Sequence, residues 1–300
     1  MTMLIVKFHA GLGNQMFQFA FYKYLKSEYP QLEIKADLTR YRYDKYLEHN
    51  GFELEKIFEN MDLDIADERE ILKAGGFWER KQDGLADILM KRITLFRSNL
   101  YRKGAVYDRR VLDDCSWKVL RNRYPERVAD KSRILHGYWA DVRVPGDGIF
   151  RFRRELYAKD SEMLSRIMSC NAISVHVRRG NYVTTGVKVL GEDYYLRAKK
   201  WMDEHVREPV YFLFSDEPEY LEENFKVFKN AFIVKENQGG DSFMDMLFMS
   251  CCKHNIICNS TFSFWGGVLN NCPDKNVILP KGYLTNYTQG LLGTWIEEEG

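Results

Sequence analysis

Short apolar runs alternate with segments of helical periodicity throughout the second half of the chain, and this alternation limits the possible folds more than any other feature of the sequence. Each apolar run has the length of a strand, and apolar residues recur at helical intervals in the segments between the runs. Because strands that alternate with helices form parallel sheets, the pattern predicts an α/β domain. The expected strands are 172–177, 210–214, 231–234, 256–258 and 277–279, and the expected helices are 194–206, 218–224, 243–254 and 264–269.

The N-terminus begins with the same alternation. The loop His9-Ala-Gly-Leu-Gly-Asn14 breaks an apolar run, a segment of helical spacing then continues to Pro30, and extended structure resumes at 32–35. Because 300 residues exceed what one hydrophobic core usually supports, we expect two Rossmann-like domains that face each other across a cleft. The expected domains are residues 1–150 and 151–285, followed by a tail, 286–300, that packs on the first domain.

The composition excludes several classes of protein. The net charge is only +1, so no nucleic-acid partner is expected, and no apolar run is long enough for a membrane-spanning helix. The N-terminal apolar run is too short for a signal peptide, which predicts a cytoplasmic location. The six cysteines show no Cys-x-x-Cys spacing and are interpreted as reduced core thiols.

Lysine and arginine outnumber acidic residues between Arg80 and Arg133. Two interpretations remain open: a solvated helical face, or a surface that docks on an anionic membrane or a lipid-linked acceptor. The second interpretation would place the protein peripherally on the inner face of the membrane.

Polar residues follow three of the expected strands, and ligands of parallel sheets bind beyond the carboxyl ends of the strands. The first such segment is His176-Val-Arg-Arg-Gly-Asn-Tyr182. Strand alternation puts His176 and Arg178 on one face and Arg179 on the other. Paired arginines bind a pyrophosphate through charge-assisted hydrogen bonds. The alternative is a structural ion-pair network.

The other two strand ends also allow two interpretations each. In Phe214-Ser-Asp-Glu-Pro218, a carboxylate would bind a guanine edge or a ribose hydroxyl, or else Ser215 or Asp216 would cap the following helix. The segment Cys258-Asn-Ser-Thr-Phe-Ser-Phe-Trp-Gly-Gly267 leads into a helix whose N-terminal N–H groups suit phosphate, or which is only capped.

The loop Gly11-Leu-Gly-Asn-Gln-Met16 matches part of a dinucleotide fingerprint, but Met16 occupies the position of the third glycine. It predicts a tight turn with close backbone approach to a ligand. No Asp-x-Asp pair follows an expected strand, so the sequence does not require a divalent metal. Arginine and helix-end amides would carry the leaving-group charge instead.

These segments together resemble the α-1,2-fucosyltransferases of glycosyltransferase family 11. The resemblance is carried, in this order, by 11–20, 136–139, 176–182, 214–216 and 245–267. It implies the GT-B arrangement of two domains, GDP-β-L-fucose as the donor substrate, and transfer with inversion to the 2-hydroxyl of a galactose-type residue in a glycan. We expect no cofactor and no metal.

The resemblance also implies roles for individual residues. Arg178 would bind the donor pyrophosphate, Asp216 would lie near the nucleoside, and His176 and Asp245 would shape the same pocket. The other residues expected at the donor are Arg179, Asn181, Tyr182, Ser215, Asn259, Ser260, Thr261, Phe262 and Ser263, with Ser260, Thr261 and Ser263 at the phosphate end. The residues expected to face the cleft from the first domain are Gly11, Gly13, Asn14, Gln15 and Trp139.

One position departs from the family pattern Arg-Arg-Gly-Asp-Tyr, because this chain has Asn181. An amide cannot take a proton from the acceptor hydroxyl. Either the position is structural, or the chain is a non-catalytic GDP-sugar or glycan-binding protein. In the first case Glu192 and Asp193, which also fit as helix-capping residues, are the candidates for a catalytic carboxylate. A Rossmann-type oxidoreductase is the third interpretation.

Overall fold

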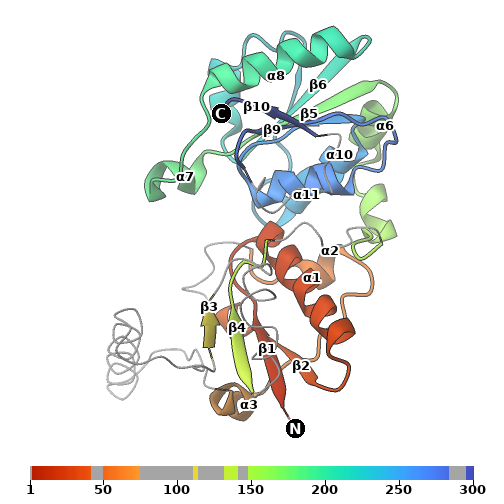
Figure 1. Ribbon diagram of the computed structural model, residues 1–300. Helices are drawn as coiled ribbons and strands as arrows, with labels where there is room; N and C mark the ends of the chain where they lie inside the picture. Colours follow the sequence, from red (N-terminus) through yellow and green to blue (C-terminus); the bar gives the residue numbers. More distant parts are fainter. Residues whose placement is uncertain (1, 42–49, 75–110, 114–131, 141–147, 284–294) are drawn as a thin grey trace. The chain divides into compact units, whose positions relative to one another are not determined.

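The computed structural model describes residues 2–41, 50–74, 111–113, 132–140, 148–283 and 295–300. The chain forms two compact domains (Figure 1). The first comprises Met1–Phe52 and Met61–Val144, and the second comprises Glu53–Asn60 and Pro145–Gly300. The chain therefore passes to the second domain at Pro145, close to the expected boundary, but a short segment from the N-terminal half also belongs to that domain. Within it, the Glu59 N–H donates to the Arg151 carbonyl at 2.8 Å.

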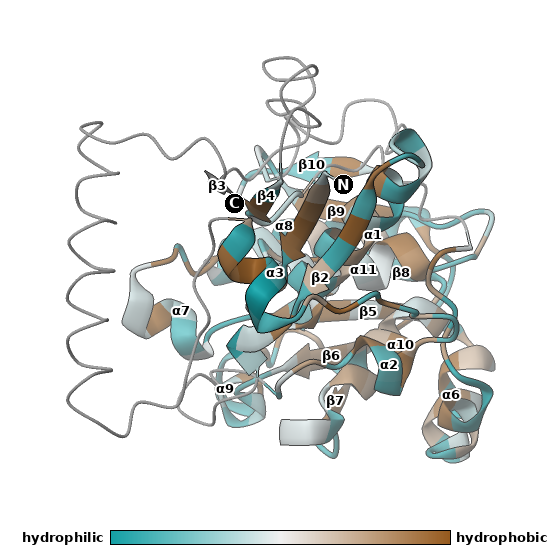
Figure 2. Cartoon of the chain, turned by 90° about the horizontal axis from the view of Figure 1, so that it is seen from below, coloured by the Kyte–Doolittle hydropathy of each residue, from teal (hydrophilic) through white to brown (hydrophobic). Residues whose placement is uncertain are grey.

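The first domain is built on a parallel sheet of four described strands in the order β2-β1-β4-β3. Four of the five residues of β1 are buried, whereas α1 carries both hydrophilic and hydrophobic bands (Figure 2). The helix begins after Gly11 and ends before Pro30, as the sequence predicts. The elements are β1 Met3–Lys7, α1 Leu12–Glu28, β2 Glu33–Asp37, η1 Thr39–Tyr41, α3 Glu68–Lys73, β3 Val111–Asp113 and β4 Arg133–His136.

The second domain is built on a parallel sheet of six described strands in the order β10-β9-β8-β5-β6-β7. Figure 1 shows α8 on one face of this sheet and α10 and α11 on the other. The strands are β5 Asn171–Val177, β6 Pro209–Ser215, β7 Phe232–Val234, β8 His254–Ile256, β9 Val277–Pro280 and β10 Ile296–Glu298. The helices are α2 Leu54–Ile57, η3 Arg154–Ala158, α6 Ser161–Met168, α7 Gly180–Thr185, α8 Glu192–His205, α9 Pro218–Asn224, η4 Gly239–Asp241, α10 Phe243–Cys251 and α11 Thr261–Leu269.

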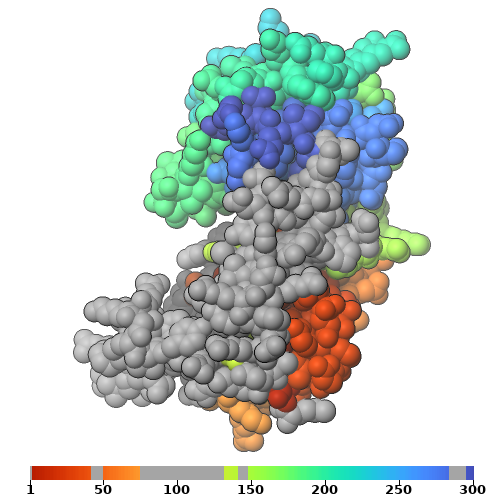
Figure 3. Space-filling model, viewed as in Figure 1, coloured from red at the N-terminus to blue at the C-terminus, as the bar shows by residue number. Residues whose placement is uncertain are grey.

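The two parallel sheets confirm the predicted α/β class with two Rossmann-like domains. The strands and helices expected in the second half are present, but β8 begins at His254, two residues before the expected start and where a helix was expected to end. The additions are η3, α6, α7, η4 and β10. The expectation that the tail packs on the first domain is wrong for its described residues. β10 pairs with β9, and the Trp295 ring lies 5.5 Å from the Phe264 ring. Figure 3 shows the C-terminal residues on the surface of the second domain.

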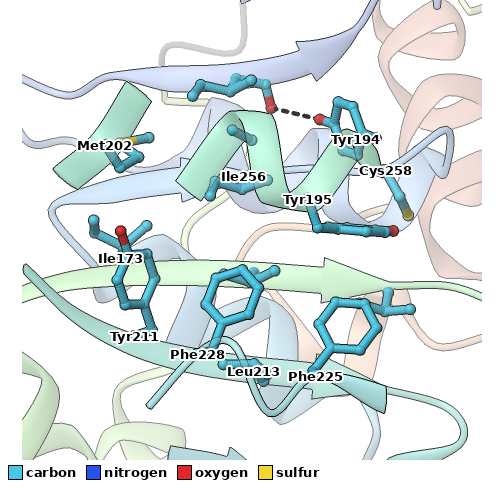
Figure 4. Close-up of a cluster of buried hydrophobic side chains, with 14 of the residues drawn as sticks. Ile173, Tyr194, Tyr195, Met202, Tyr211, Leu213, Phe225, Phe228, Ile256 and Cys258 are labelled. Carbon is cyan, nitrogen blue, oxygen red and sulfur yellow. Dashed lines mark hydrogen bonds between the residues drawn. The ribbon is translucent and has the colours of Figure 1, made fainter. Parts of the chain in front are cut away.

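An aromatic core beneath α8 fixes the central strands of the second sheet (Figure 4). The hydroxyl of Tyr194 donates to the carbonyls of Ile257, at 2.5 Å, and Ile278. The hydroxyl of the neighbouring Tyr195 donates to the His176 carbonyl at 3.2 Å. Because buried hydroxyl groups need partners, these bonds fix the end of β5 and the segment after β8 relative to α8. The carboxyl ends of both strands are thereby held rigid.

Candidate active site

Three polar segments meet at the carboxyl end of the second sheet. β5 lies between β8 and β6, so the chain leaves this edge in opposite directions from β5 and β8, which defines a topological switch point. The His176 Nδ1 atom lies 3.1 Å from the Cys258 Sγ atom. The Tyr182 hydroxyl donates to the Asn259 carbonyl at 2.9 Å. The segments after β5 and β8 therefore form one surface at the position where such sheets bind ligands.

Arg178 is the cationic residue at this switch point. Its Nη1 atom lies 3.2 Å from the Asp216 Oδ2 atom, and its Nη2 atom donates to the Asn181 Oδ1 atom at 2.9 Å. The ring of Tyr182 lies 5.7 Å below the guanidinium. The Arg178 side chain remains 27% exposed. The guanidinium is therefore held in one orientation and is still accessible to an anionic ligand.

Arg179 has a different role from Arg178, as strand alternation predicts. Its Nε atom donates to the Glu217 Oε2 atom at 3.0 Å, and its guanidinium lies 3.6 Å from the centre of the Tyr220 ring. Its backbone N–H donates to the Asp216 Oδ1 atom at 3.0 Å. For Arg179 the structural ion-pair interpretation fits, because its side chain packs against α9.

Gly180 allows Asp216 to approach the arginine pair. A Cβ atom on this residue would lie 2.1 Å from the Asp216 Oδ2 atom, well inside van der Waals contact. Asp216 therefore does not cap α9. The local hydrogen bond before this helix is made by Ser215, whose Oγ atom accepts the Glu217 N–H at 3.0 Å. The glycine after the two arginines is required by this close approach.

The first turn of α11 follows β8 at the same edge. Ser260 caps the helix by accepting the Phe262 N–H at 3.3 Å, and the buried Ser263 hydroxyl accepts the Cys258 N–H at 3.3 Å. The Phe262 ring lies 5.7 Å from the His176 ring, and Thr261 is half-buried beside it. A helix N-terminus carries a partial positive charge even when it is capped. Both sequence interpretations of this segment are therefore compatible with the structure.

Burial leaves two further groups at the switch point uncharged. It lowers the pKa of His176 to about 3, and the nearby Arg178 lowers it further in the same direction. Burial also raises the pKa of Cys258 to about 12. At neutral pH the imidazole and the thiol are both neutral. Arg178 and the helix N-terminus supply the positive potential here.

A pocket of about 340 Å³ lies beyond the ends of β8 and β9. Asn259 lines it, and its Nδ2 atom donates to the Lys188 carbonyl at 2.8 Å. The Asn259 Oδ1 atom is buried, and within the described chain it accepts no hydrogen bond. A polar side chain therefore forms part of the pocket wall. Its other lining residues are Leu190, Pro280, Lys281, Gly282, Tyr283, Glu299 and Gly300.

Asp245 lies on α10, where its Oδ1 atom accepts a hydrogen bond from the Asn237 Nδ2 atom at 2.8 Å. Burial raises its pKa to about 8, against the opposing effect of Asn237, so the carboxyl group is mainly protonated at neutral pH. Asn237 could not be predicted from the sequence, because its contact with Asp245 forms only through the fold.

Glu192 and Asp193 occupy the exposed first turn of α8. Acidic residues at this position stabilise a helix through its dipole. Neither carboxylate forms a described ion pair or hydrogen bond with Arg178. The structure thus brings together the residues after β5, β6 and β8 but does not join these two acidic residues to them.

The first domain corrects two of the expected cleft residues. The Trp139 side chain is fully buried and stacks on Phe21 at 4.2 Å, and Gln15 is fully buried with its Nε2 atom donating to the Ala10 carbonyl at 3.1 Å. These two side chains hold the loop and do not line a cleft. Gly11 and Asn14 are half-buried at the start of α1, and Gly13 is buried.

Metal-ligating clusters and membrane-spanning helices are both absent from the part of the chain that the structure describes. No group of three or more His, Cys, Asp or Glu side chains suited to hold a metal occurs among the residues that the structure describes. Within the same residues, none of the helices has the length and apolarity to cross a membrane. The basic segment between Arg80 and Arg133 lies almost wholly outside the described residues.

Comparison with known proteins agrees with this geometry. Residues 148–289 match the family described as Glycosyl transferase family 11. The alpha-1,2-colitosyltransferase of Escherichia coli is 28% identical over 90% of this chain and 89% of its own. The O-antigen biosynthesis glycosyltransferase WbnK of the same organism is 28% identical over 95% of this chain and 97% of its own. The crystal structure of NodZ alpha-1,6-fucosyltransferase soaked with GDP-fucose is 15% identical, covers 88% of this chain and 91% of its own, and gives a TM-score of 0.49.

The chain has two Rossmann-like domains, and one of them carries a cationic switch point. Together with relatives of this kind, these features define a glycosyltransferase with a GT-B-like fold. The family match begins at residue 148, near the start of the second domain, and continues past β9 to residue 289. It includes every segment at the switch point. The residues of the second domain thus resemble Glycosyl transferase family 11.

Proposed function

We propose that this glycosyltransferase transfers L-fucose from GDP-β-L-fucose to the 2-hydroxyl of a galactose-type residue in a glycan, with inversion and without a metal. The observation that carries the proposal is Arg178, held by Asp216 and Asn181 beside the N-terminus of α11. This is the charge pattern that a departing nucleoside diphosphate requires.

Leaving-group stabilisation supplies most of the catalysis in this proposal. As the bond between fucose C1 and the diphosphate breaks, negative charge develops on the phosphate oxygens. A guanidinium that is already oriented stabilises this charge without reorganising, which favours the transition state over the ground state. The acceptor oxygen attacks C1 from the face opposite the diphosphate, so the anomeric centre inverts.

Asn181 fits a structural role in this scheme. Its Oδ1 atom accepts the hydrogen bond from the Arg178 Nη2 atom, which is a task that a carboxylate would also perform. The residue therefore orients the guanidinium without exchanging a proton. As the acceptor oxygen bonds to C1 and the bond from C1 to the diphosphate breaks, the hydroxyl becomes more acidic and its proton passes to solvent water. Alignment with an oxocarbenium-like centre therefore contributes more than an initial deprotonation.

Calorimetry and turnover assays together test the proposal. We expect GDP and GDP-fucose to bind the protein and NADP not to bind. GDP release should depend on an added β-galactoside and persist in EDTA, and NMR of the product should show an α-1,2 linkage. Binding of GDP without turnover on any glycan would contradict the proposal in favour of a GDP-sugar-binding protein. Binding of NADP alone would favour an oxidoreductase.

A colitosyl donor is the second candidate, because a relative of 28% identity that aligns with 90% of this chain is an alpha-1,2-colitosyltransferase. Parallel assays with nucleotide-linked fucose and nucleotide-linked colitose decide between the two donors. A screen of free and lipid-linked β-galactosides by mass spectrometry would identify the acceptor. The same screen would test whether an anionic lipid surface raises the rate.

A further inference from the structure

The first domain has a carboxyl edge of its own, where β1 and β4 lie side by side. β1 and β4 are neighbours in the order β2-β1-β4-β3, with β2 on one side of the pair and β3 on the other. Lys7 of β1 is paired with His136 of β4. His9 and Tyr138 each lie two residues beyond that pair, at the same level beyond the carboxyl edge. By the rule that placed the donor site, this edge is also a ligand position.

Aromatic rings occupy this edge. The Tyr138 ring lies 4.9 Å from the His9 ring at an angle of 39°, and the His136 ring lies 4.8 Å from the His9 ring at 79°. Tyr138 is 45% exposed, whereas its neighbour Trp139 is fully buried. The carboxyl edge of β1 and β4 therefore presents one accessible aromatic ring on a rigid support of buried and half-buried rings.

The buried side chain of Gln18 fixes the position of His9 relative to the loop that carries Tyr138. The Gln18 Oε1 atom accepts the His9 backbone N–H at 3.1 Å, which orients the amide group. The Gln18 Nε2 atom then donates to the His9 Nδ1 atom at 2.9 Å and to the Gly137 carbonyl at 3.2 Å. One side chain thus ties the loop after β1 to the loop after β4. Burial and the adjacent His136 lower the pKa of His9 to about 3, so the supporting imidazole is uncharged at neutral pH.

The backbone is strained beside both residues. Ala10, which follows His9, has φ of 64°, and Trp139, which follows Tyr138, has φ of 53°. Left-handed backbone is uncommon for residues other than glycine and is particularly unfavourable for a bulky one. Such strain is kept where surrounding contacts enforce it and often marks a functional site. Here the stacking of Trp139 on Phe21 enforces it, with Tyr138 left at the surface.

We propose that Tyr138 is a binding residue for the acceptor, against whose ring a neutral sugar of the glycan stacks, and that His9 is its positioning residue. A sugar presents C–H groups on one face and hydroxyls at its rim, so an exposed aromatic ring with a polar edge complements it. Lys7 and Arg40 act on His9 from nearby, so it is the exposed face of the Tyr138 ring, and not an absence of charge, that favours a sugar here. The inference rests on the proposed function and names the residue that binds its acceptor.

Kinetics with both substrates varied separately test the inference. Tyr138→Ala should raise the acceptor KM roughly tenfold, in line with the loss of one aromatic stacking contact, and leave the KM for the donor unchanged. Tyr138→Phe, which keeps the ring, should remain close to the wild type. Tyr157 is a matched control because it is 44% exposed in the second domain, and Tyr157→Ala should change neither KM. An unchanged acceptor KM in Tyr138→Ala would overturn the inference.

The positioning role of His9 has its own test. His9→Ala should raise the acceptor KM by less than Tyr138→Ala does, with kcat and the donor KM preserved. A general loss of structure would lower kcat and donor binding together, and thermal unfolding would detect it. An acceptor KM equal to that of the wild type would remove His9 from the site.

Direct binding distinguishes failure of this inference from failure of the proposed function. Saturation-transfer NMR with methyl β-galactoside and lactose detects sugar contact without any turnover. If the protein neither binds GDP nor transfers fucose, the proposed function fails, yet loss of the sugar signal in Tyr138→Ala would still support the stacking site. Retention of that signal in Tyr138→Ala would overturn the stacking site, whatever the activity.

Discussion

The carboxyl edges of the two parallel sheets carry different chemistry. The one in the second domain holds Arg178 between Asp216 and Asn181, beside a helix N-terminus. The one in the first domain holds Tyr138 against an uncharged His9. Both parallel sheets offer a ligand position at their carboxyl edge. The residues beyond the strands decide what binds there. A cationic edge suits a diphosphate, and an aromatic edge suits a neutral sugar.

Removing the charge of the second domain is expected to have the largest effect. Arg178→Ala should lower kcat/KM on the order of 10²-fold or more, because one strong donor to the leaving group is lost. Steady-state kinetics measure this, and the acceptor KM should stay the same. Arg166→Ala is the control, since Arg166 is an exposed arginine on α6 that pairs with Glu162. Near-normal activity in Arg178→Ala would show that the phosphate site lies elsewhere.

Displacing Asp216, which holds the Arg178 guanidinium, should have a smaller effect. Gly180→Ala places a Cβ atom 2.1 Å from the Asp216 Oδ2 atom, so Asp216 must move away from both arginines. We expect kcat/KM to fall roughly tenfold, as for a misplaced positioning contact. Gly240→Ala is the control, because nothing lies within 4 Å of its Cβ position. Equal activities of the two variants would mean that the orientation of Arg178 is set by other contacts.

The buried carboxyl group of Asp245 should make stability depend on pH. Its pKa is raised to about 8 in the folded protein, so the folded state binds this proton more tightly than the unfolded state. The associated stability is present at low pH and is lost as the pH rises toward 8. Relative to Asp245→Asn, the wild type should lose on the order of 1 kcal/mol per pH unit between pH 5 and 8. Urea unfolding of both proteins at each pH measures this, and parallel curves would contradict it.

Restoring the family aspartate should have the smallest effect. Asn181→Asp keeps an oxygen that accepts the Arg178 Nη2 hydrogen bond, so turnover should change only a few-fold. Asn181→Ala removes the acceptor and should be the more damaging change. Turnover assays over a range of pH compare the three proteins. A rise of 10²-fold in Asn181→Asp would instead assign this position to a missing general base.

Local patterns were sufficient to predict the segments of the site but not the roles of the residues within them. The alternation of side chains along a strand places Arg178 and Arg179 on opposite faces. The sequence alone does not show which of the two faces a ligand. The contact between Arg179 and Tyr220 settles the role of Arg179, and it joins residues that are distant in sequence. Trp139 was expected in a cleft because it belongs to a motif, yet the side chain that reaches the surface is that of Tyr138.

The sequence by itself determined both parallel sheets, the start of α1 and the polar strand ends, because periodicity, glycine and proline act over a few residues of chain. Only the tertiary structure decided that β10 joins β9, that Asn237 meets Asp245, and that Gln18 ties two loops together. These choices depend on burial and on pairing between distant segments, whose free energy is realised only when the whole core forms. Strand order belongs to the same class, and it is what brings β5 beside β8 and β1 beside β4.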